Sequence, residues 1–137
     1  MTINYLSTKG GVSSVDFDEA VLQGFAIDGG LFVPNKIPSI TKKQFEEWSK
    51  LSFAELAINI LSLYINKNLV HPDDLNSIVY KSFSSFQSQD KVEIVQLSGF
   101  ENTYIVELFH GPTLSFKDMA MGFLLNIMDY FLEKRKK

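Results

Sequence analysis

Apolar residues recur at helical spacing between residues 53 and 65 of the chain. One face of a helix repeats every three or four positions, and the apolar residues of this segment follow that period. The pattern predicts a core helix whose apolar stripe is buried. The stripe consists of Phe53, Leu56, Ala57, Ile60, Leu61 and Tyr64.

A common starting signal precedes this helix and two others. A Ser, Thr or Asp followed three residues later by Glu or Gln lets the two side chains cap exposed backbone amides reciprocally. The pairs Ser52–Glu55, Thr41–Gln44 and Asp16–Glu19 match this signal. Three helices are therefore predicted to begin at these places, and Gly24 can end the short helix over 17–23 in a left-handed conformation.

Prolines mark a fourth helix and a connector. Pro72 suits the first turn of a helix over 72–83, and the two acids that follow it suit the positive end of that helix. The segment 26–38 contains a turn signal and two prolines, of which Pro34 is the first, and these argue against a regular strand or helix. We expect a packed connector there.

The hydrophobic pattern changes after residue 87. The runs "VEIVQL" (92–97) and "TYIVELF" (103–109) are β-branched and apolar, and the polar "SGFEN" between them predicts a hairpin or two adjacent strands. We therefore expect a domain boundary between Gln87 and Lys91, with one domain over 1–90 and the start of a second over 91–137.

The last segment predicts a long helix that begins near Ser115. Its apolar residues cover so much of the circumference that the helix is expected to be buried on most sides. Ser115 and Asp118 again have capping-box spacing, which makes Ser115 the expected N-cap and puts Lys117 at the second helical position. The apolar positions are Phe116, Met119, Ala120, Met121, Phe123, Leu124, Leu125, Ile127, Met128 and Phe131.

A lysine at that position indicates amine chemistry. The N-terminus of a helix carries roughly half a positive charge, which disfavours the ammonium form of Lys117 and favours its neutral amine. A neutral amine attacks aldehydes to form Schiff bases, and the same helix end attracts anions. A phosphate-bearing aldehyde such as pyridoxal phosphate would suit both features. The alternative interpretation is a solvated surface lysine.

Composition narrows the class of protein. A content of 45% hydrophobic and 21% charged residues is typical of a globular domain with a core. The net charge is −3 and the basic residues cluster only over 134–137, so no nucleic-acid partner is expected. The absence of cysteine excludes disulfides, thiolate metal sites and thiol nucleophiles. No signal peptide or long apolar run is found, so we expect a cytoplasmic protein with no membrane partner.

The two histidines do not indicate a metal site. His71 stands beside two acids at the start of a helix, where capping is the simpler explanation. His110 and Thr113 follow the second strand, at the end of a sheet where ligands commonly bind, and both a pocket-lining and a turn-forming role stay open for them. Glu107 and Asp118 lie on different elements with no fixed separation. No metal is therefore expected.

The stretch "ELFHGPTLSFKD" (107–118) resembles the lysine motif of threonine synthases, which are fold-type II pyridoxal-phosphate enzymes. Upstream, "YLSTKGG" (5–11) and "VDFDEAVLQGFAIDGGLFVP" (15–34) are similar to the N-terminal domain of that family, although Lys9 stands where arginine is commoner. The resemblance covers the whole chain. It implies an α/β fold, with an α+β N-terminal domain of mostly helices and short strands, followed by the first strands and helix of a fold-type II cofactor domain.

The resemblance also assigns roles to residues. Lys117 would form the Schiff base with pyridoxal phosphate. Phe116 would lie against the pyridine ring of the cofactor and also belong to the apolar stripe of its helix. Asp118 is given no chemistry and is expected to be the capping partner of Ser115.

The reaction implied for the parent enzyme converts O-phospho-L-homoserine and water to L-threonine and phosphate. Two alternatives stay open: a threonine synthase-like phospho-lyase that acts on a related phosphorylated substrate, and a non-catalytic interaction module. Enzymes of this family hold the cofactor phosphate in a glycine-rich loop, but the only glycine after Lys117 is Gly122, inside the helix. We therefore expect an inactive N-terminal fragment without cofactor, which self-associates through residues after Val92 because its strand edges and apolar faces are exposed.

Overall fold

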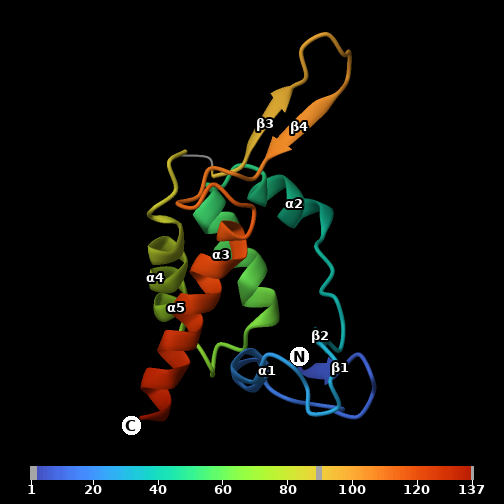
Figure 1. Cartoon of the computed structure of the whole chain (residues 1–137), viewed down its shortest axis with the longest axis vertical. Helices are drawn as coiled ribbons and strands as arrows, with labels where there is room; N and C mark the ends of the chain where they lie inside the picture. The colour runs from blue at the N-terminus through green and yellow to red at the C-terminus, as the bar shows by residue number, and fades with distance from the viewer. Residues whose placement is uncertain (1–2, 89–90, 137) are drawn as a thin grey trace.

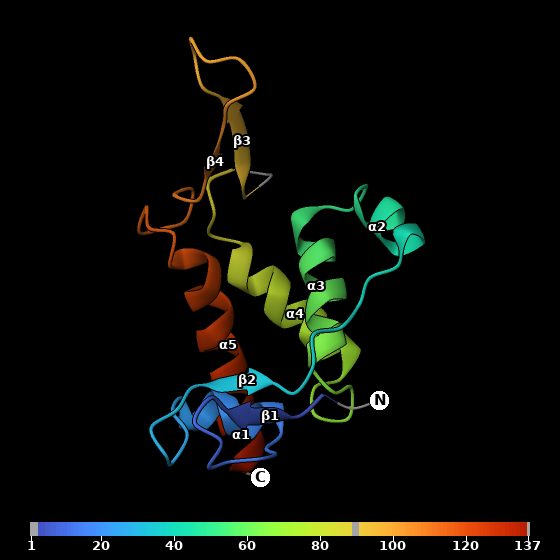
Figure 2. The ribbon, with the colours of Figure 1, turned by 90° about the vertical axis from the view of Figure 1, so that its right-hand side faces the viewer.

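The computed structural model describes residues 3–88 and 91–136, which form five helices and two small antiparallel sheets (Figures 1 and 2). The predicted α/β class, with mostly helices and short strands, is confirmed. The predicted boundary between Gln87 and Lys91 includes residues 89 and 90, which lie outside the described residues. Within the described ranges, no helix combines the length and apolar character needed to cross a membrane.

The first sheet joins two short strands near the N-terminus. Strand β1 (Tyr5–Ser7) pairs antiparallel with β2 (Phe32–Pro34), and Tyr5 lies opposite Pro34. The prediction that the connector contains no regular strand was wrong. The backbone N–H of Asn35 donates to the carbonyl of Asn4, and Tyr5 exchanges both of its backbone hydrogen bonds with Val15. Tyr5 and Pro34 therefore form a non-hydrogen-bonded pair of the antiparallel sheet. Because no backbone hydrogen bond is required of Pro34 at this position, its missing N–H does not weaken the sheet.

Two short helices begin where the sequence predicts. Helix α1 (Phe17–Gln23) ends at Gly24, whose φ of 73° is in the range that favours glycine. The capping box predicted for α1 is absent, because the side chain of its N-cap, Asp16, makes no capping hydrogen bond. Helix α2 (Lys42–Trp48) has the predicted capping box between Thr41 and Gln44.

Helices α3 (Phe53–Tyr64) and α4 (Pro72–Phe83) supply much of the core. The predicted capping box of α3 is confirmed, and the N-cap of α4 is His71, whose ring accepts from the amide of Asp73. The predicted apolar stripe of α3 is only partly buried, and Ile60 is exposed. The main core consists of Ile65, Val70, Leu75, Ile78, Val79, Phe83, Phe86, Ile127 and Phe131.

Helix α5 (Asp118–Arg135) packs against α4 and α1. It is less buried than its sequence predicts: of its apolar residues only Ile127 and Phe131 are buried, and Leu125 is 60% exposed. Helix α5 comes close to α4 at Gly122, which lies against the backbone of Ser82. The apolar residues of α5 therefore mark the faces that could be buried. The other described residues cover only some of these faces.

The second sheet is a hairpin that projects from the helices (Figures 1 and 2). Strand β3 (Glu93–Gln96) pairs antiparallel with β4 (Tyr104–Glu107), as the sequence predicts. Ile94 and Val106 lie opposite each other and are 67% and 54% exposed. The chain then returns from β4 through a loop to the start of α5.

Candidate functional site

The loop between β4 and α5, residues 108–117, carries most of the predicted site residues. Its conformation is fixed by Asp118, the first residue of α5, which is only 8% exposed. The carboxylate of Asp118 accepts one hydrogen bond from the backbone N–H of Thr113 (2.8 Å) and another from the Thr113 hydroxyl (2.7 Å). We call these two hydrogen bonds the Asp118 clamp.

The clamp leaves no room for a side chain at Gly111. A Cβ atom at this buried position would collide with the Asp118 side chain. Leu114, three residues further on, has a φ of 57°, which is uncommon for a bulky residue, and its N–H donates to the carbonyl of Gly111 (3.1 Å). The loop is therefore a tight and specific turn, and Thr113 takes part in forming it.

The start of α5 differs from the predicted capping box. Ser115 is not the N-cap; that position is held by Lys117, which has helical backbone angles and no side-chain capping bond. The Ser115 hydroxyl accepts from the amide of Lys117 (3.3 Å), and the Ser115 carbonyl accepts from the amide of Asp118 (3.0 Å). Asp118 was expected to complete the box with Ser115, but its side chain is engaged by Thr113 instead. Lys117 therefore lies at the helix boundary and not at the predicted second helical position.

Lys117 and Phe116 are presented on the surface of the chain. Lys117 is exposed, and Phe116 is 65% exposed. The expectation that Phe116 also belongs to a buried stripe of α5 was therefore wrong. The carbonyl of Lys117 accepts from the amides of Ala120 and Met121 (3.1 and 2.9 Å), so the backbone of this lysine is held by the first turn of α5 while its side chain extends outward.

Glu107 and His110 form a polar group at the base of the hairpin. The Nε2 atom of His110 lies 2.9 Å from a carboxylate oxygen of Glu107, and both side chains are about one-fifth exposed. Glu93 lies opposite Glu107 in the sheet, and ligand atoms of the three side chains are within 4.8 Å of one another. Two carboxylates and an imidazole are donors that a divalent metal accepts, although no metal was expected from the sequence.

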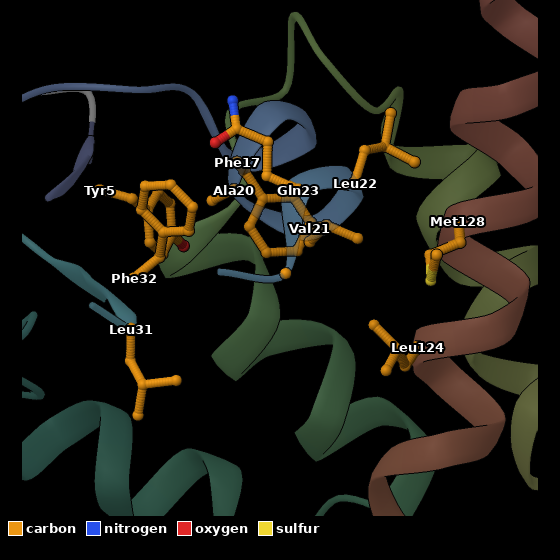
Figure 3. Close-up of a pocket in the computed structure, with 11 residues that line it drawn as sticks. Tyr5, Phe17, Ala20, Val21, Leu22, Gln23, Leu31, Phe32, Leu124 and Met128 are labelled. Atoms are coloured by element: carbon orange, nitrogen blue, oxygen red, sulfur yellow. The ribbon is translucent and has the colours of Figure 1, made fainter. Parts of the chain in front are cut away.

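Two adjoining hollows of the structure are lined almost entirely by apolar side chains. One of them is a groove of about 610 Å³. Its lining includes Phe17 and Val21 of α1 and Leu124 and Met128 of α5 (Figure 3). A second groove, of about 580 Å³, continues from it along α3 and shares Phe17, Val21 and Leu124. The only titratable side chain in the two linings is Tyr5, whose hydroxyl donates to the carbonyl of Tyr64 (3.2 Å). These grooves offer apolar contact and no chemistry.

Comparison with known proteins identifies the family. Residues 4–83 match the family described as "Threonine synthase N terminus". The chain therefore belongs to the threonine synthase N-terminal family. It is 42% identical over 133 residues to threonine synthase of Schizosaccharomyces pombe, and the match covers 97% of this chain and 26% of that protein. It is 38% identical to threonine synthase-like 2 of Xenopus laevis, and here the match covers 98% of this chain and 28% of that protein.

A solved structure agrees with these sequence matches. The threonine synthase of Brucella melitensis, described as bound to PLP, superimposes with a TM-score of 0.92 at 34% identity and covers 99% of this chain and 29% of that chain. The chain thus spans about a quarter of the length of the relatives it matches. The resemblance found in the sequence is confirmed at the level of the family and of its N-terminal portion.

Sequence reasoning missed two features of this site. Asp118 was paired with Ser115 in the sequence analysis, whereas in the structure its partner is Thr113. An Asp five residues after a Thr in a turn-rich loop is the signal that could have identified this pair. The group formed by Glu93, Glu107 and His110 depends on the register of the hairpin, and only the paired strands bring these residues together.

Proposed function

We propose that this chain supplies the cofactor-binding lysine of a pyridoxal-phosphate enzyme that converts O-phospho-L-homoserine and water to L-threonine and phosphate. The observation that carries the proposal is the position of Lys117, an exposed amine whose backbone is fixed between an ordered loop and the first turn of α5. Support comes from relatives named threonine synthase and from a related structure described as bound to PLP.

The residues present fit one end of the cofactor. Lys117 would bind the aldehyde through its Nζ atom, and the exposed ring of Phe116 offers an apolar face for a flat heterocycle. When bound, pyridoxal phosphate withdraws electrons from the carbon atoms of an attached amino acid. The Lys117 amine, once released, can accept and return protons at the substrate carbons. These two residues are the site residues that we propose.

Among the described residues that follow Lys117, no glycine-rich loop offers a comparable site for the phosphate of the cofactor. The only glycine after Lys117 is Gly122, and its backbone packs against Ser82, so it cannot form a phosphate loop. We therefore propose that residues 1–137 alone are inactive and hold no cofactor stably. The division into a domain over 1–90 and a second unit over 91–137 belongs to the same proposal, and it is supported by the end of the family match at residue 83.

The function is tested in the complete protein that carries this chain, loaded with pyridoxal phosphate. Lys117→Ala is expected to abolish the visible absorbance of the lysine-bound cofactor and the formation of threonine. Lys50→Ala, at another exposed lysine, is the matched control and is expected to change neither. Persistence of the absorbance band in Lys117→Ala would exclude Lys117 from this role.

The products formed distinguish the alternatives. Equal amounts of phosphate and threonine from O-phospho-L-homoserine support a threonine synthase. Phosphate released without threonine indicates a phospho-lyase that acts on a related substrate. A complete protein that binds no cofactor would favour a non-catalytic interaction module.

We further propose that residues 1–137, when isolated, self-associate through the hairpin. The exposed pair formed by Ile94 and Val106 places apolar side chains on a two-stranded sheet whose outer edges are unpaired among the described residues. The double substitution Ile94→Thr with Val106→Thr keeps β-branched side chains and removes apolar area. Sedimentation is expected to show less association than in the unchanged chain. Ile37→Thr, at another exposed isoleucine, is the control, and an equal effect of both changes would contradict the assignment to the hairpin.

A further inference from the structure

We propose that Asp118 is the positioning residue for Lys117, and that it acts by clamping the preceding loop through Thr113. This inference rests on the function proposed for Lys117. Asp118 is the only carboxylate buried in the parts of the chain that the structure describes. Both of its oxygens are engaged by one residue: Oδ2 accepts from the Thr113 amide and Oδ1 from the Thr113 hydroxyl.

A carboxylate in the first turn of a helix usually faces solvent and interacts with the helix dipole. Asp118 instead turns inward against Gly111, where no side chain could be accommodated. The hydrogen bond from the Thr113 hydroxyl, aided by backbone N–H donors, lowers the pKa of the Asp118 carboxyl below its ordinary value. The clamp is thus an ionised acceptor at neutral pH, and both of its hydrogen bonds are charge-assisted.

The loop needs such a clamp because its backbone is not in a relaxed conformation. Leu114 is held at a φ of 57°, and it is exposed, so burial of its own side chain cannot maintain that angle. Two hydrogen bonds hold the backbone at this point. The N–H of Leu114 donates to the carbonyl of Gly111, and the N–H of Thr113 donates to the carboxylate of Asp118. Without the carboxylate, we expect the segment 111–116 to sample other conformations.

The clamp bears directly on the reactive amine because Lys117 is adjacent to Asp118. The amide of Lys117 donates to Ser115 within the clamped loop, and its carbonyl accepts from the first turn of α5. The lysine backbone therefore has two supports, the loop on one side and the helix on the other. Loss of the clamp removes the loop support, and a displacement of about 1 Å at a reacting group can reduce its rate by roughly a hundredfold.

The proposal is tested with a matched pair of substitutions at Thr113 in the complete protein that carries this chain. Thr113→Val keeps the shape of the side chain and removes the hydroxyl donor, whereas Thr113→Ser restores the hydroxyl. Asp118→Asn removes the charge of the acceptor. Asp129→Asn, at an exposed acid of the same helix, is the control. Each protein is mixed with pyridoxal phosphate, the adduct is reduced with borohydride at intervals, and the modified fraction of Lys117 is measured by peptide mass spectrometry.

We expect adduct formation at Lys117 to slow by about tenfold or more in Thr113→Val and Asp118→Asn. It should stay within about twofold of the unchanged protein in Thr113→Ser and Asp129→Asn. Amide hydrogen exchange over residues 111–117 should accelerate in the two slow variants only, while the thermal midpoint of the whole protein reports any general loss of stability.

Three other results would overturn the proposal. Adduct formation at the unchanged rate in both Thr113→Val and Asp118→Asn would show that the clamp does not position the lysine. A slow Thr113→Ser variant would show that the size of the side chain matters and not its hydroxyl. An unchanged protein that forms no adduct at Lys117 would remove the proposed function itself, and a positioning role would fall with it.

Discussion

Gly122 on helix α5 provides a sharp test of how α4 and α5 pack. A Cβ atom at this position would lie 2.8 Å from the backbone carbonyl oxygen of Ser82. Ordinary contact distances are larger by roughly half an ångström or more, so in Gly122→Ala the two helices must separate. A backbone oxygen in a helix cannot rotate aside as a flexible side chain can.

Two opposing effects determine the outcome of Gly122→Ala. Alanine is favoured over glycine inside a helix by about 1 kcal/mol. Overpacking in a well-packed region costs about 1–3 kcal/mol. Separation of the helices would also strain two hydrogen bonds that cross the contact, from the Ser82 hydroxyl to the Gly122 carbonyl (3.2 Å) and from Asn126 to the Ser82 hydroxyl (3.2 Å). Each of these contributes about 1 kcal/mol, and if strain removes about half of each, the combined effects give an expected net loss of about 1–3 kcal/mol in the free energy of unfolding.

The assay is urea unfolding followed by far-ultraviolet circular dichroism. Gly122→Ala should lower the urea midpoint without changing the slope of the transition, because the surface exposed on unfolding stays the same. Met121→Ala, at the exposed neighbouring position, is the control and should change stability by less than about 0.5 kcal/mol. If Gly122→Ala were as stable as the unchanged protein or more stable, the close approach of α4 and α5 would be refuted, since helix propensity would then be the only effect observed.

Two further predictions concern the buried residues Ile127 and Tyr5. Ile127→Ala, at a side chain with no exposed surface, should cost about 2–5 kcal/mol in urea unfolding, whereas Leu125→Ala, which is 60% exposed, should cost far less; equal costs would contradict the assigned faces of α5. Burial raises the pKa of Tyr5 to about 12, above the value of about 10 in the unfolded chain, so the folded state favours the neutral hydroxyl. The unfolded state therefore binds fewer protons between about pH 10 and 12, so the contribution of Tyr5 to stability should be fully present below pH 10 and should be lost across that window, by at most about 2–3 kcal/mol. Tyr5→Phe should lack this part of the pH dependence, and an identical decline in both proteins would assign the loss to other groups.

Local signals in the sequence were sufficient for the elements that depend on a few adjacent residues. The capping boxes at Thr41 and Ser52 each need only a side chain and a backbone amide three residues away, and both are present. The strand that contains Pro34 could not be predicted in this way. Whether its missing N–H matters depends on the register with Tyr5, which is 29 positions away in the sequence and becomes known only when the sheet has formed.

Burial was the property least accessible from the sequence. The period of α5 correctly identifies Ile127 and Phe131 as core positions, since both are buried. The same period also marks Leu125 as apolar, and it is largely exposed. A periodic pattern shows which face of a helix is apolar. That face is buried only where another element packs against it.

The exposure of Lys117 and the burial of Asp118 fit the two different roles proposed for them. Successive residues at a helix start point about 100° apart, so adjacent side chains face different surroundings. Asp118 is buried and both of its oxygens are engaged in the loop, whereas Lys117 is exposed. A side chain that fixes the loop must have its hydrogen bonds satisfied within the protein, but a side chain that reacts must keep its amine accessible to a ligand. One residue cannot meet both requirements, and two adjacent residues on different sides of the same helix start can.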